Sequence, residues 1–253
     1  MLLKPLIKLN GNTLSIPAVH ITGLGFGYPG SGKAIFAGLG LDVQQGERFG
    51  LFGPNGAGKT TLMSLMPGLI TAGSGTIKLL GKPVATDKSA KRLFGFVPQD
   101  FSFYHELSPA ENMAFFGAWA GLDQTTIRKR TDELLEILGL ADVKHKQVRQ
   151  FSGGMKRRVN LAIGVIHHPK ILFLDEPTVG VDVQTRHAIL NYLLQLNKEG
   201  TTLVYTSHQL NEAQELCNHL ALIDEGRIIA NGKMQQLLTD YQQQDLEVLF
   251  LSL

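Results

Sequence analysis

A glycine-rich loop between an apolar segment and a helical pattern offers the clearest chemistry in this sequence. Residues 53–61 read GPNGAGKTT and follow the short run 48–52. Gly53, Gly56 and Gly58 let the main chain turn so tightly that successive N–H groups point into one concavity, which fits phosphate oxygens. The helix expected after the loop would add the positive end of its dipole. The loop therefore predicts a site for the phosphates of a nucleotide.

Two side chains complete the chemistry of this loop. Lys59 supplies a compact positive charge for the β- and γ-phosphates, and Thr60 supplies a hydroxyl for Mg²⁺. A glycine-rich turn with a chance lysine is the alternative, but the strand before, the helix after and the filled motif positions argue against it. We therefore expect a nucleoside triphosphate and Mg²⁺ to bind here. The expected binding residues of the loop are Gly53, Pro54, Asn55, Gly56, Ala57, Gly58, Lys59, Thr60 and Thr61.

A pair of acidic residues forms the second chemical feature. Residues 171–177 read ILFLDEP, so that Asp175 ends an apolar segment, where its carboxylate can hold Mg²⁺ directly or through water. Glu176 can face the γ-phosphate and orient or deprotonate the attacking water. An acidic turn at a strand end is the alternative, which the phosphate loop in the same chain disfavours. The loop and the acidic pair together predict hydrolysis of the bound nucleotide.

Short apolar segments provide the elements that must position these groups. Residues 49–52, 93–97, 171–175 and 202–206 are rich in β-forming side chains, and each runs into a polar or glycine-containing turn. Helical patterns lie between them, for example over 187–196. This alternation predicts an α/β fold with a mostly parallel sheet. Functional groups should then gather at the carboxyl ends of the strands.

Two segments have a different pattern of residues. Residues 19–45 are short, alternating and punctuated by glycine, which predicts antiparallel hairpins. Residues 101–150 read as an inserted helical unit. One helix should begin at the capping box 108–111 and end near Gly121, and a second should cover 126–138.

We therefore expect one domain made of several parts. The phosphate-loop NTPase core should comprise residues 49–100 and 151–233. An antiparallel β subdomain should lie within 1–48, an all-helical insertion should span 101–150, and a helical tail should span 234–253.

Two glycine-rich segments imitate nucleotide loops. Residues 25–30 read GFGYPG and satisfy a dinucleotide-binding pattern, but that pattern needs a helix directly afterwards, and Pro29 favours a turn. Residues 27–34 come within one residue of a second phosphate loop, although Ala34 lacks a hydroxyl for a metal. We interpret both segments as loops and nothing more.

The composition excludes several classes of protein. The chain has 253 residues, of which 43% are hydrophobic and 18% charged, with a net charge of +2. This mix supports a globular core and gives no strong field for nucleic acid. Cys217 is the single cysteine, which excludes an internal disulfide and suits a reducing cytoplasm. No apolar run reaches about 18 residues and residues 1–5 lack a signal-peptide core, so we expect no membrane span.

A third motif connects these features to a known family. Residues 151–155 read FSGGM, enter a helix placed from Lys156 onward, and precede the LFLDEP segment. This arrangement resembles the signature of ABC ATPases, and the resemblance runs from about Val19 to Lys233. Further positions that match the family pattern in order are Tyr28 at the adenine-stacking aromatic, Gln99 in the Q-loop, Asp182 in the D-loop and His208 at the switch histidine.

The resemblance implies roles for these residues. Gln99 would reach Mg²⁺ or the attacking water and would report the γ-phosphate to the helical insertion, and His208 would hydrogen-bond a γ-phosphate oxygen. With Lys59 and Glu176 they form the expected catalytic set, while Thr60, Gln99 and Asp175 form the expected metal set. Tyr28 would stack on adenine, with packing in a turn as its alternative.

In the ABC family, the signature loop of one subunit caps the ATP held by another. Ser152, Gly153 and Gly154 would therefore contact a γ-phosphate across a dimer interface. The resemblance implies a head-to-tail homodimer over two ATP molecules, with a heterodimer as the open alternative. Met155 departs from the family pattern, which most often has glutamine, but the main phosphate contacts are intact and we expect activity.

The resemblance favours an ATP-binding subunit of an ABC transporter, located on the cytoplasmic face of a membrane and paired with a separate transmembrane permease. Phe101, Phe103 and Tyr104 offer an apolar docking surface for that permease, with the core of the insertion as an equal alternative. The sequences FSGGMKRR and LDEPTVGVD and the segment 246–251 look like those of bacterial exporters of drugs, lipids or polysaccharides.

Two other functions remain as alternatives. A soluble ABC ATPase that acts on ribosomes or DNA is disfavoured by the single cassette, the single cysteine and the small net charge. A regulatory ABC ATPase that acts on a membrane protein without moving a solute would use the same motifs, so the sequence does not separate it from a transporter.

Overall fold

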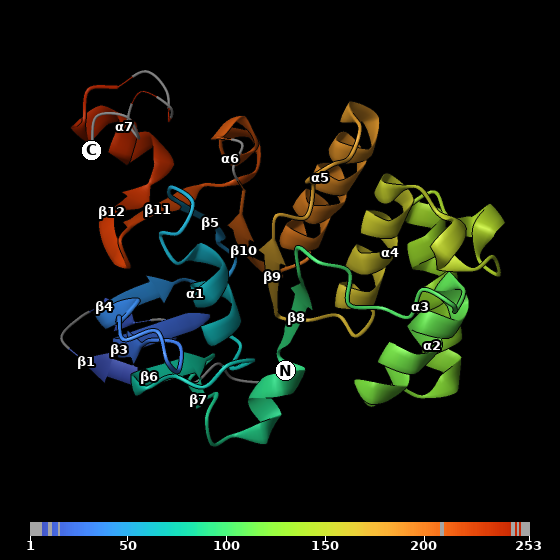
Figure 1. Ribbon diagram of the computed structural model, residues 1–253, viewed down its shortest axis with the longest axis horizontal. Coiled ribbons are helices and arrows are strands. Elements are labelled where there is room, and N and C mark those ends of the chain that lie inside the picture. Colours follow the sequence, from blue (N-terminus) through green and yellow to red (C-terminus); the bar gives the residue numbers. More distant parts are fainter. Residues whose placement is uncertain are drawn as a thin grey trace.

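The computed structural model describes residues 7–9, 12–14, 16–207, 210–243, 246 and 248. A large sheet occupies the middle of the molecule, a smaller antiparallel sheet lies at one end, and a group of helices lies at the other (Figure 1). The predicted fold class, an α/β core with an antiparallel subdomain and a helical insertion, is confirmed.

The central sheet has six strands in the order β12-β11-β5-β10-β9-β8. Its strands are β5 (Arg48–Phe52), β8 (Phe94–Val97), β9 (Ile171–Asp175), β10 (Thr202–Thr206), β11 (His219–Asp224) and β12 (Arg227–Lys233). All neighbouring pairs are parallel except β11 with β12. The four predicted core strands are present, and β11 and β12 are two further strands that were not predicted from the sequence.

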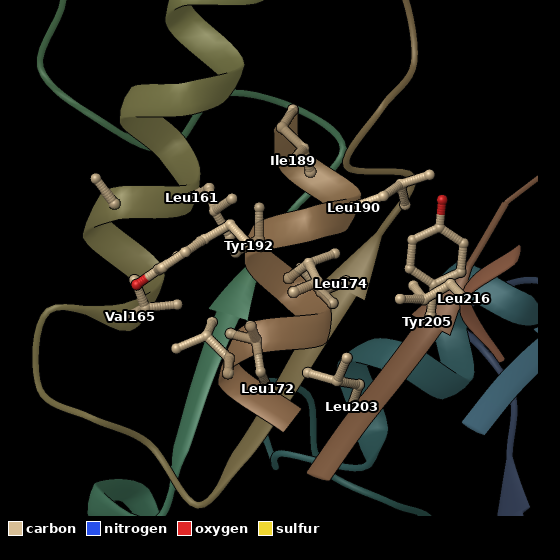
Figure 2. Packing of buried hydrophobic residues seen from close by; sticks show 14 of the residues in the cluster. Leu161, Val165, Leu172, Leu174, Ile189, Leu190, Tyr192, Leu203, Tyr205 and Leu216 are labelled. Carbon is tan, nitrogen blue, oxygen red and sulfur yellow. The ribbon is translucent and has the colours of Figure 1, made fainter. Parts of the chain in front are cut away.

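Alternating side chains of the central sheet enter two hydrophobic layers. In β9, Leu172 and Leu174 point to the layer that contains α4 (Gly153–Val165) and α5 (Val183–Lys198), as Figure 2 shows. Ile171 and Phe173 belong to the opposite layer, which contains α1 (Lys59–Leu65) and the antiparallel sheet. All five residues of β9 are buried. Burial on both faces explains why the core strands read as continuous apolar runs.

The antiparallel sheet has the strand order β4-β3-β6-β7. Its strands are β3 (Val19–Phe26), β4 (Phe36–Val43), β6 (Ser74–Leu79) and β7 (Lys82–Pro83), and a separate hairpin pairs β1 (Ile7–Leu9) with β2 (Asn12–Leu14). The predicted hairpin character of residues 19–45 is present. The sheet extends beyond the expected 1–48 segment, because β6 pairs directly with β3.

Helices α2 (Pro109–Trp119) and α3 (Gln124–Ile137) form the insertion and pack on α4. The capping box is present, since the Ser108 hydroxyl accepts from the Glu111 N–H while Glu111 accepts from the Ser108 N–H. The shorter helical elements are η1 (Lys88–Arg92), η2 (Ala141–Val143), η3 (Val148–Gln150), α6 (Leu210–Leu216) and α7 (Met234–Asp240). Of the predicted tail 234–253, α7 is helical, and most residues after 243 lie outside the described part of the chain.

Candidate functional site

One pocket brings together several of the residues predicted from the sequence to bind nucleotide. It measures about 390 Å³ and is lined by Ile35, Asn55, Gly56, Gly58, Lys59, Thr60, Thr61, Gln99 and Glu176. The loop after β5, the segment after β8 and the turn after β9 supply most of this lining. Because these three strands run parallel, their carboxyl ends meet at one edge of the sheet, where α/β proteins place their ligands.

The loop after β5 has a main-chain shape that requires glycine. Gly58 has a φ of 106° immediately before α1, which is a left-handed conformation that strains any other residue. At Gly53, a Cβ atom would lie 2.0 Å from the carbonyl oxygen of Ile223 at the end of β11. These two positions hold the loop close to the sheet and leave its main chain open to the pocket, as a phosphate cradle needs.

Lys59 is held inside the loop. Its side chain is buried, and its Nζ donates to the carbonyl oxygens of Gly53 at 2.8 Å and Pro54 at 3.0 Å. Burial lowers the pKa of Lys59, and the carboxylates of Glu176 and Asp175 partly offset this effect. The ammonium group and both carboxylates therefore act on one another within a single site.

The acidic pair lies at the end of β9. The Asp175 carboxylate is 2% exposed and accepts a 2.6 Å hydrogen bond from the Thr206 hydroxyl of the neighbouring β10. Glu176 is buried and has a φ of 50°, a left-handed conformation that costs about 1–3 kcal/mol for a non-glycine residue. The Glu176 N–H donates to the Thr206 carbonyl at 3.1 Å, which holds this turn in place. The strained turn brings Glu176 into the lining of the pocket.

Gln99 contacts the proposed base directly. Its Nε2 donates to Oε2 of Glu176 at 3.2 Å, although the two residues are far apart in the sequence. An amide and a carboxylate in contact beside a phosphate cradle can hold a water molecule between them and the phosphate. The structure thus joins Gln99, Glu176 and Lys59, while His208 lies outside the described residues.

The side chains expected to hold Mg²⁺ are of the kinds that bind this ion in nucleotide-dependent enzymes. Within the described residues, no group of three or more His, Cys, Asp or Glu side chains could hold a metal. Mg²⁺ commonly takes only one or two carboxylates from the protein and completes its shell with water and substrate phosphates. Thr60 and Gln99 line the pocket, and Asp175 directly precedes Glu176, which also lines it, so the oxygen atoms of these three side chains are of the types that would fit such a site.

Tyr28 lies at the edge of the site. Its ring is 49% exposed, and its hydroxyl is 3.3 Å from the Thr61 hydroxyl in α1. The edge-to-face contact with Phe26, at 5.1 Å between ring centroids, fixes the ring against the end of β3. An exposed aromatic ring attached to the phosphate loop fits a base-stacking role.

The signature segment lies outside this pocket. Ser152 caps α4 by accepting from the Met155 N–H at 3.3 Å, and α4 begins at Gly153, earlier than the Lys156 start that the sequence indicated. Ser152 and Gly153 are exposed. Asp182 caps α5 by accepting from the Thr185 N–H at 2.9 Å, which lowers the pKa of Asp182. A Cβ atom on Gly154 would lie 3.6 Å from the Asp182 carboxylate, so the two segments form one surface.

The aromatic residues after Gln99 divide into two groups. Phe103 is buried in the core and Phe101 stacks on it at 5.3 Å, so Phe103 serves as core and not as docking surface. Tyr104 is exposed and contacts Phe115 of α2 at 5.0 Å. Trp119, at the end of α2, is 82% exposed. The exposed apolar surface therefore lies on Tyr104 and α2.

Other residues that shape the site carried no signal in the sequence. Ile35 lines the pocket from the loop before β4, where an isolated aliphatic residue fits no motif. Thr206 holds both Asp175 and the Glu176 main chain from β10. Threonine at a strand end is common, and only the strand order places it beside the acidic pair.

Comparisons with known proteins find similar chains. The family model described as ABC transporter matches residues 36–179. The chain is 42% identical over 206 residues to the linearmycin resistance ATP-binding protein LnrL of Bacillus subtilis (strain 168), covering 81% of this chain and 66% of that protein. It is 39% identical over 226 residues to the Nod factor export ATP-binding protein I of Ralstonia nicotianae, covering 89% of this chain and 70% of that protein. The chain thus spans about two thirds of the length of these curated relatives.

Solved structures show the same architecture. The structure of an ATP-binding subunit of an ABC transporter superimposes with a TM-score of 0.86 at 25% identity, covering 93% of this chain and 98% of that one. The structure of cbiO1 from Clostridium perfringens, described as part of the ABC transporter complex cbiONQ, gives a TM-score of 0.77 at 28% identity, covering 88% and 91%. None of the helices in the described part of the chain combines the length and the apolar character that crossing a membrane requires.

Proposed function

Because this chain belongs to the ABC transporter family of ATP-binding proteins, we propose that it hydrolyses ATP with Mg²⁺ in a head-to-tail dimer and thereby drives a separate transmembrane permease. The observation that carries the proposal is the pocket in which the glycine loop, Lys59, Gln99 and Glu176 converge. As a peripheral subunit, the protein would act on the cytoplasmic face of the membrane.

Each residue of the site has its own proposed role in ATP hydrolysis. Main-chain N–H groups of the loop and the Lys59 ammonium bind the phosphates, and Tyr28 stacks on adenine. Thr60, Gln99 and Asp175 would hold Mg²⁺, which supplies positive charge against the phosphate oxygens when bound. Gln99 and Glu176 orient a water molecule. Glu176 accepts its proton as the water oxygen bonds to the γ-phosphorus, while the bond to the β–γ bridging oxygen breaks and ADP leaves. His208 is proposed to hydrogen-bond the γ-phosphate.

The exposed signature surface supports the dimer. Ser152, Gly153, Gly154 and Asp182 lie at helix N-termini on the surface, and none of them lines the pocket of their own chain. A second copy placed head to tail would set this surface against the phosphate end of the pocket. Two composite sites would then close with ATP and open after hydrolysis.

Replacing Ser152 with arginine tests this composite site. A long cationic side chain at the signature surface should block closure and lower turnover by about 100-fold or more, because the phosphate contacts from the second copy are lost. ATP affinity of the separate subunits should change by less than about twofold, since the pocket of each chain is untouched. Turnover is measured by phosphate release, and affinity is measured by equilibrium binding of a fluorescent ATP analogue.

A matched control removes a helix cap of the same kind elsewhere. Asp123 caps α3 by accepting from the Thr126 N–H at 3.0 Å, so Asp123→Arg also loses a cap and gains a large cation. We expect near-normal turnover for Asp123→Arg. Full activity of Ser152→Arg would contradict the composite site.

The exposed aromatic surface on α2 is the proposed contact for the permease. Tyr104, Phe115 and Trp119 are each about half exposed or more. Tyr104 contacts Phe115, and Trp119 follows Phe115 by about one turn of α2. Large exposed aromatic side chains are typical of protein contact surfaces. Several relatives are named Nod factor export ATP-binding protein I, which supports export as the direction of transport.

The double variant Phe115→Ala with Trp119→Ala should lose the permease while it keeps ATP turnover within about twofold, because neither side chain lines the pocket. Membranes of the native host are solubilised in detergent with ATP, and proteins that copurify with the Glu176→Gln subunit, with and without this double change, are identified by mass spectrometry. Ile137→Ala, at another exposed apolar residue, is the control.

The copurifying proteins also separate the two candidate functions. A stoichiometric polytopic membrane protein that depends on Phe115 and Trp119 supports the transporter subunit. Ribosomal proteins, DNA-repair factors or no membrane protein at all would support the alternative, a soluble or regulatory ABC ATPase.

A further inference from the structure

Arg157 contacts the two main-chain segments that carry the proposed catalytic pair. It lies in the first turns of α4, shortly after the signature glycines, and is 8% exposed. Its Nη1 donates to the carbonyl oxygen of Gln99, and its Nε donates to the carbonyl oxygen of Val179 at 3.3 Å. Its guanidinium carbon lies 4.8 Å from the centre of the Phe101 ring. One side chain thus joins the signature helix to segments from two other parts of the sequence.

These contacts close a ring around Gln99 and Glu176. The Gln99 side chain donates to the Glu176 carboxylate at 3.2 Å. The Glu176 carbonyl accepts from the Val179 N–H at 3.3 Å, and the Val179 carbonyl accepts from Arg157. The Gln99 main chain returns to Arg157. The guanidinium therefore fixes the main chain on both sides of the Gln99–Glu176 contact.

The guanidinium is suited to this position by its shape. Its donors point in fixed directions within one plane, so a single group serves two carbonyl acceptors and also stacks on an aromatic ring. Burial lowers the pKa of Arg157, and the carboxylates of Asp100 and Glu176 partly offset that effect. Hydrogen bonds from a charged donor are stronger than neutral ones, so they compensate for part of the cost of burial.

A second contact attaches the same helix to the segment before Gln99. The Asn160 Nδ2 donates to the Pro98 carbonyl at 3.1 Å, one helical turn after Arg157. Two side chains of α4 therefore donate to consecutive carbonyl oxygens, those of Pro98 and Gln99. A shift of this helix would move the Gln99 main chain with it.

We propose that Arg157 is a positioning residue that links the placement of the signature helix α4 to the contact between Gln99 and Glu176. Ser152 at the start of α4 is the residue proposed to contact ATP on the second subunit. Docking of the signature surface would therefore fix the relative positions of Gln99 and Glu176 through Arg157. The inference rests on the proposed ATP hydrolysis and extends it to a residue that does not line the pocket.

The test is a double-mutant cycle between Arg157→Met and Gln99→Ala in the full chain, read as kcat and KM for ATP. Methionine keeps an unbranched apolar stem and removes every donor. We expect Arg157→Met to lower kcat by about 10- to 100-fold, the effect of losing charged hydrogen bonds. The KM and the affinity for a fluorescent ATP analogue should stay within about twofold, because the phosphate loop is untouched. The double variant should be no slower than the slower single variant, because both act through one contact.

A matched control separates positioning from stability. Arg130 on α3 is also largely buried and donates to the carbonyl oxygens of Ile166 and Val165, each at 3.4 Å, at the far end of α4. Arg130→Met should lower the thermal midpoint by a similar amount but leave kcat within about twofold. Arg157→Lys, which keeps the charge without the planar fork, should give an intermediate kcat. If Arg157→Met does not fold, Arg157→Lys takes its place in the double-mutant cycle.

The outcomes are distinct. A lowered kcat with unchanged nucleotide affinity and a non-additive cycle supports the proposal. Additive effects, a kcat loss no larger than that of Arg130→Met, or a parallel loss of nucleotide binding would overturn the role of Arg157 while the ATPase activity of the wild type stands. Absence of ATP turnover in the wild type would overturn the proposed function, and this inference with it.

Discussion

Replacing Glu176 with glutamine is expected to lower ATP turnover by about 100- to 10,000-fold while ATP binding persists, the range that general-base catalysis contributes. Glu176 is 3% exposed and is one of the residues lining the pocket. The amide has nearly the same size as the carboxylate but cannot accept the proton of the attacking water. Its carbonyl oxygen can still accept the hydrogen bond from Gln99, so the geometry of the pocket should survive.

The readouts separate binding from chemistry. Phosphate release gives turnover, equilibrium binding of a fluorescent ATP analogue gives affinity, and gel filtration with ATP and Mg²⁺ gives the oligomeric state. We expect the Glu176→Gln protein to accumulate as a closed dimer, because ATP holds the dimer together until it is hydrolysed. The wild type should dissociate as it turns over.

Glu225 offers a matched control for this substitution. It is an exposed glutamate that also has a positive φ, 42°, in the turn between β11 and β12. Glu225→Gln repeats the change of charge and the backbone conformation away from the pocket, and it should leave turnover unchanged. If the Glu176→Gln protein hydrolysed ATP at the normal rate, Glu176 would not be the base.

The central fold was predictable because its strands are buried on both faces. A strand such as β9, with every residue buried, must be apolar throughout and must end where polar groups return, so its limits appear in the sequence. The capping box at Ser108 is equally local, since both of its partners lie within one helical turn.

The missed strands have different causes. β6 contains exposed serine, glycine and threonine and acquires its strand conformation by pairing with β3. β12 has only one fully buried residue and forms the edge of the sheet beside β11. β11 does carry a sequence signal, the apolar run in HLALID before the turn at Glu225, although it was not predicted as a strand.

The candidate site was also predictable only in part. Motif spacing placed the phosphate loop and the acidic pair, because each motif lies within a few consecutive residues. The contacts between motifs were not predictable, because the order of the strands and the packing of the helices decide them. Thr206 beside Asp175 is one case, and Arg157 beside Gln99 is another. Arg157 lies in the run KRR, which reads as an ordinary basic helix face, and only the tertiary fold buries it.

Replacing Lys59 with alanine should have the largest effect on nucleotide binding. The Lys59 ammonium is the cation of the phosphate loop, and it is held by the carbonyl oxygens of Gly53 and Pro54. Its loss removes a buried positive charge from a site built for phosphates and leaves Asp175 and Glu176 without their cationic neighbour. Loss of one partner from a buried charged contact costs about 2–5 kcal/mol, which corresponds to a fall in ATP affinity of roughly 30- to several thousand-fold.

A lysine in a similar glycine-rich segment serves as the control for Lys59→Ala. Lys33 lies in the glycine-rich segment 27–34, which nearly repeats the phosphate-loop pattern, and it is exposed. Lys33→Ala should leave ATP affinity within about twofold, because the segment precedes a strand instead of a helix and Ala34 has no hydroxyl for Mg²⁺. Affinity for a fluorescent ATP analogue is measured for both variants. Retained affinity in Lys59→Ala together with loss in Lys33→Ala would move the nucleotide to the other loop, and equal retention in both would refute the phosphate-loop assignment.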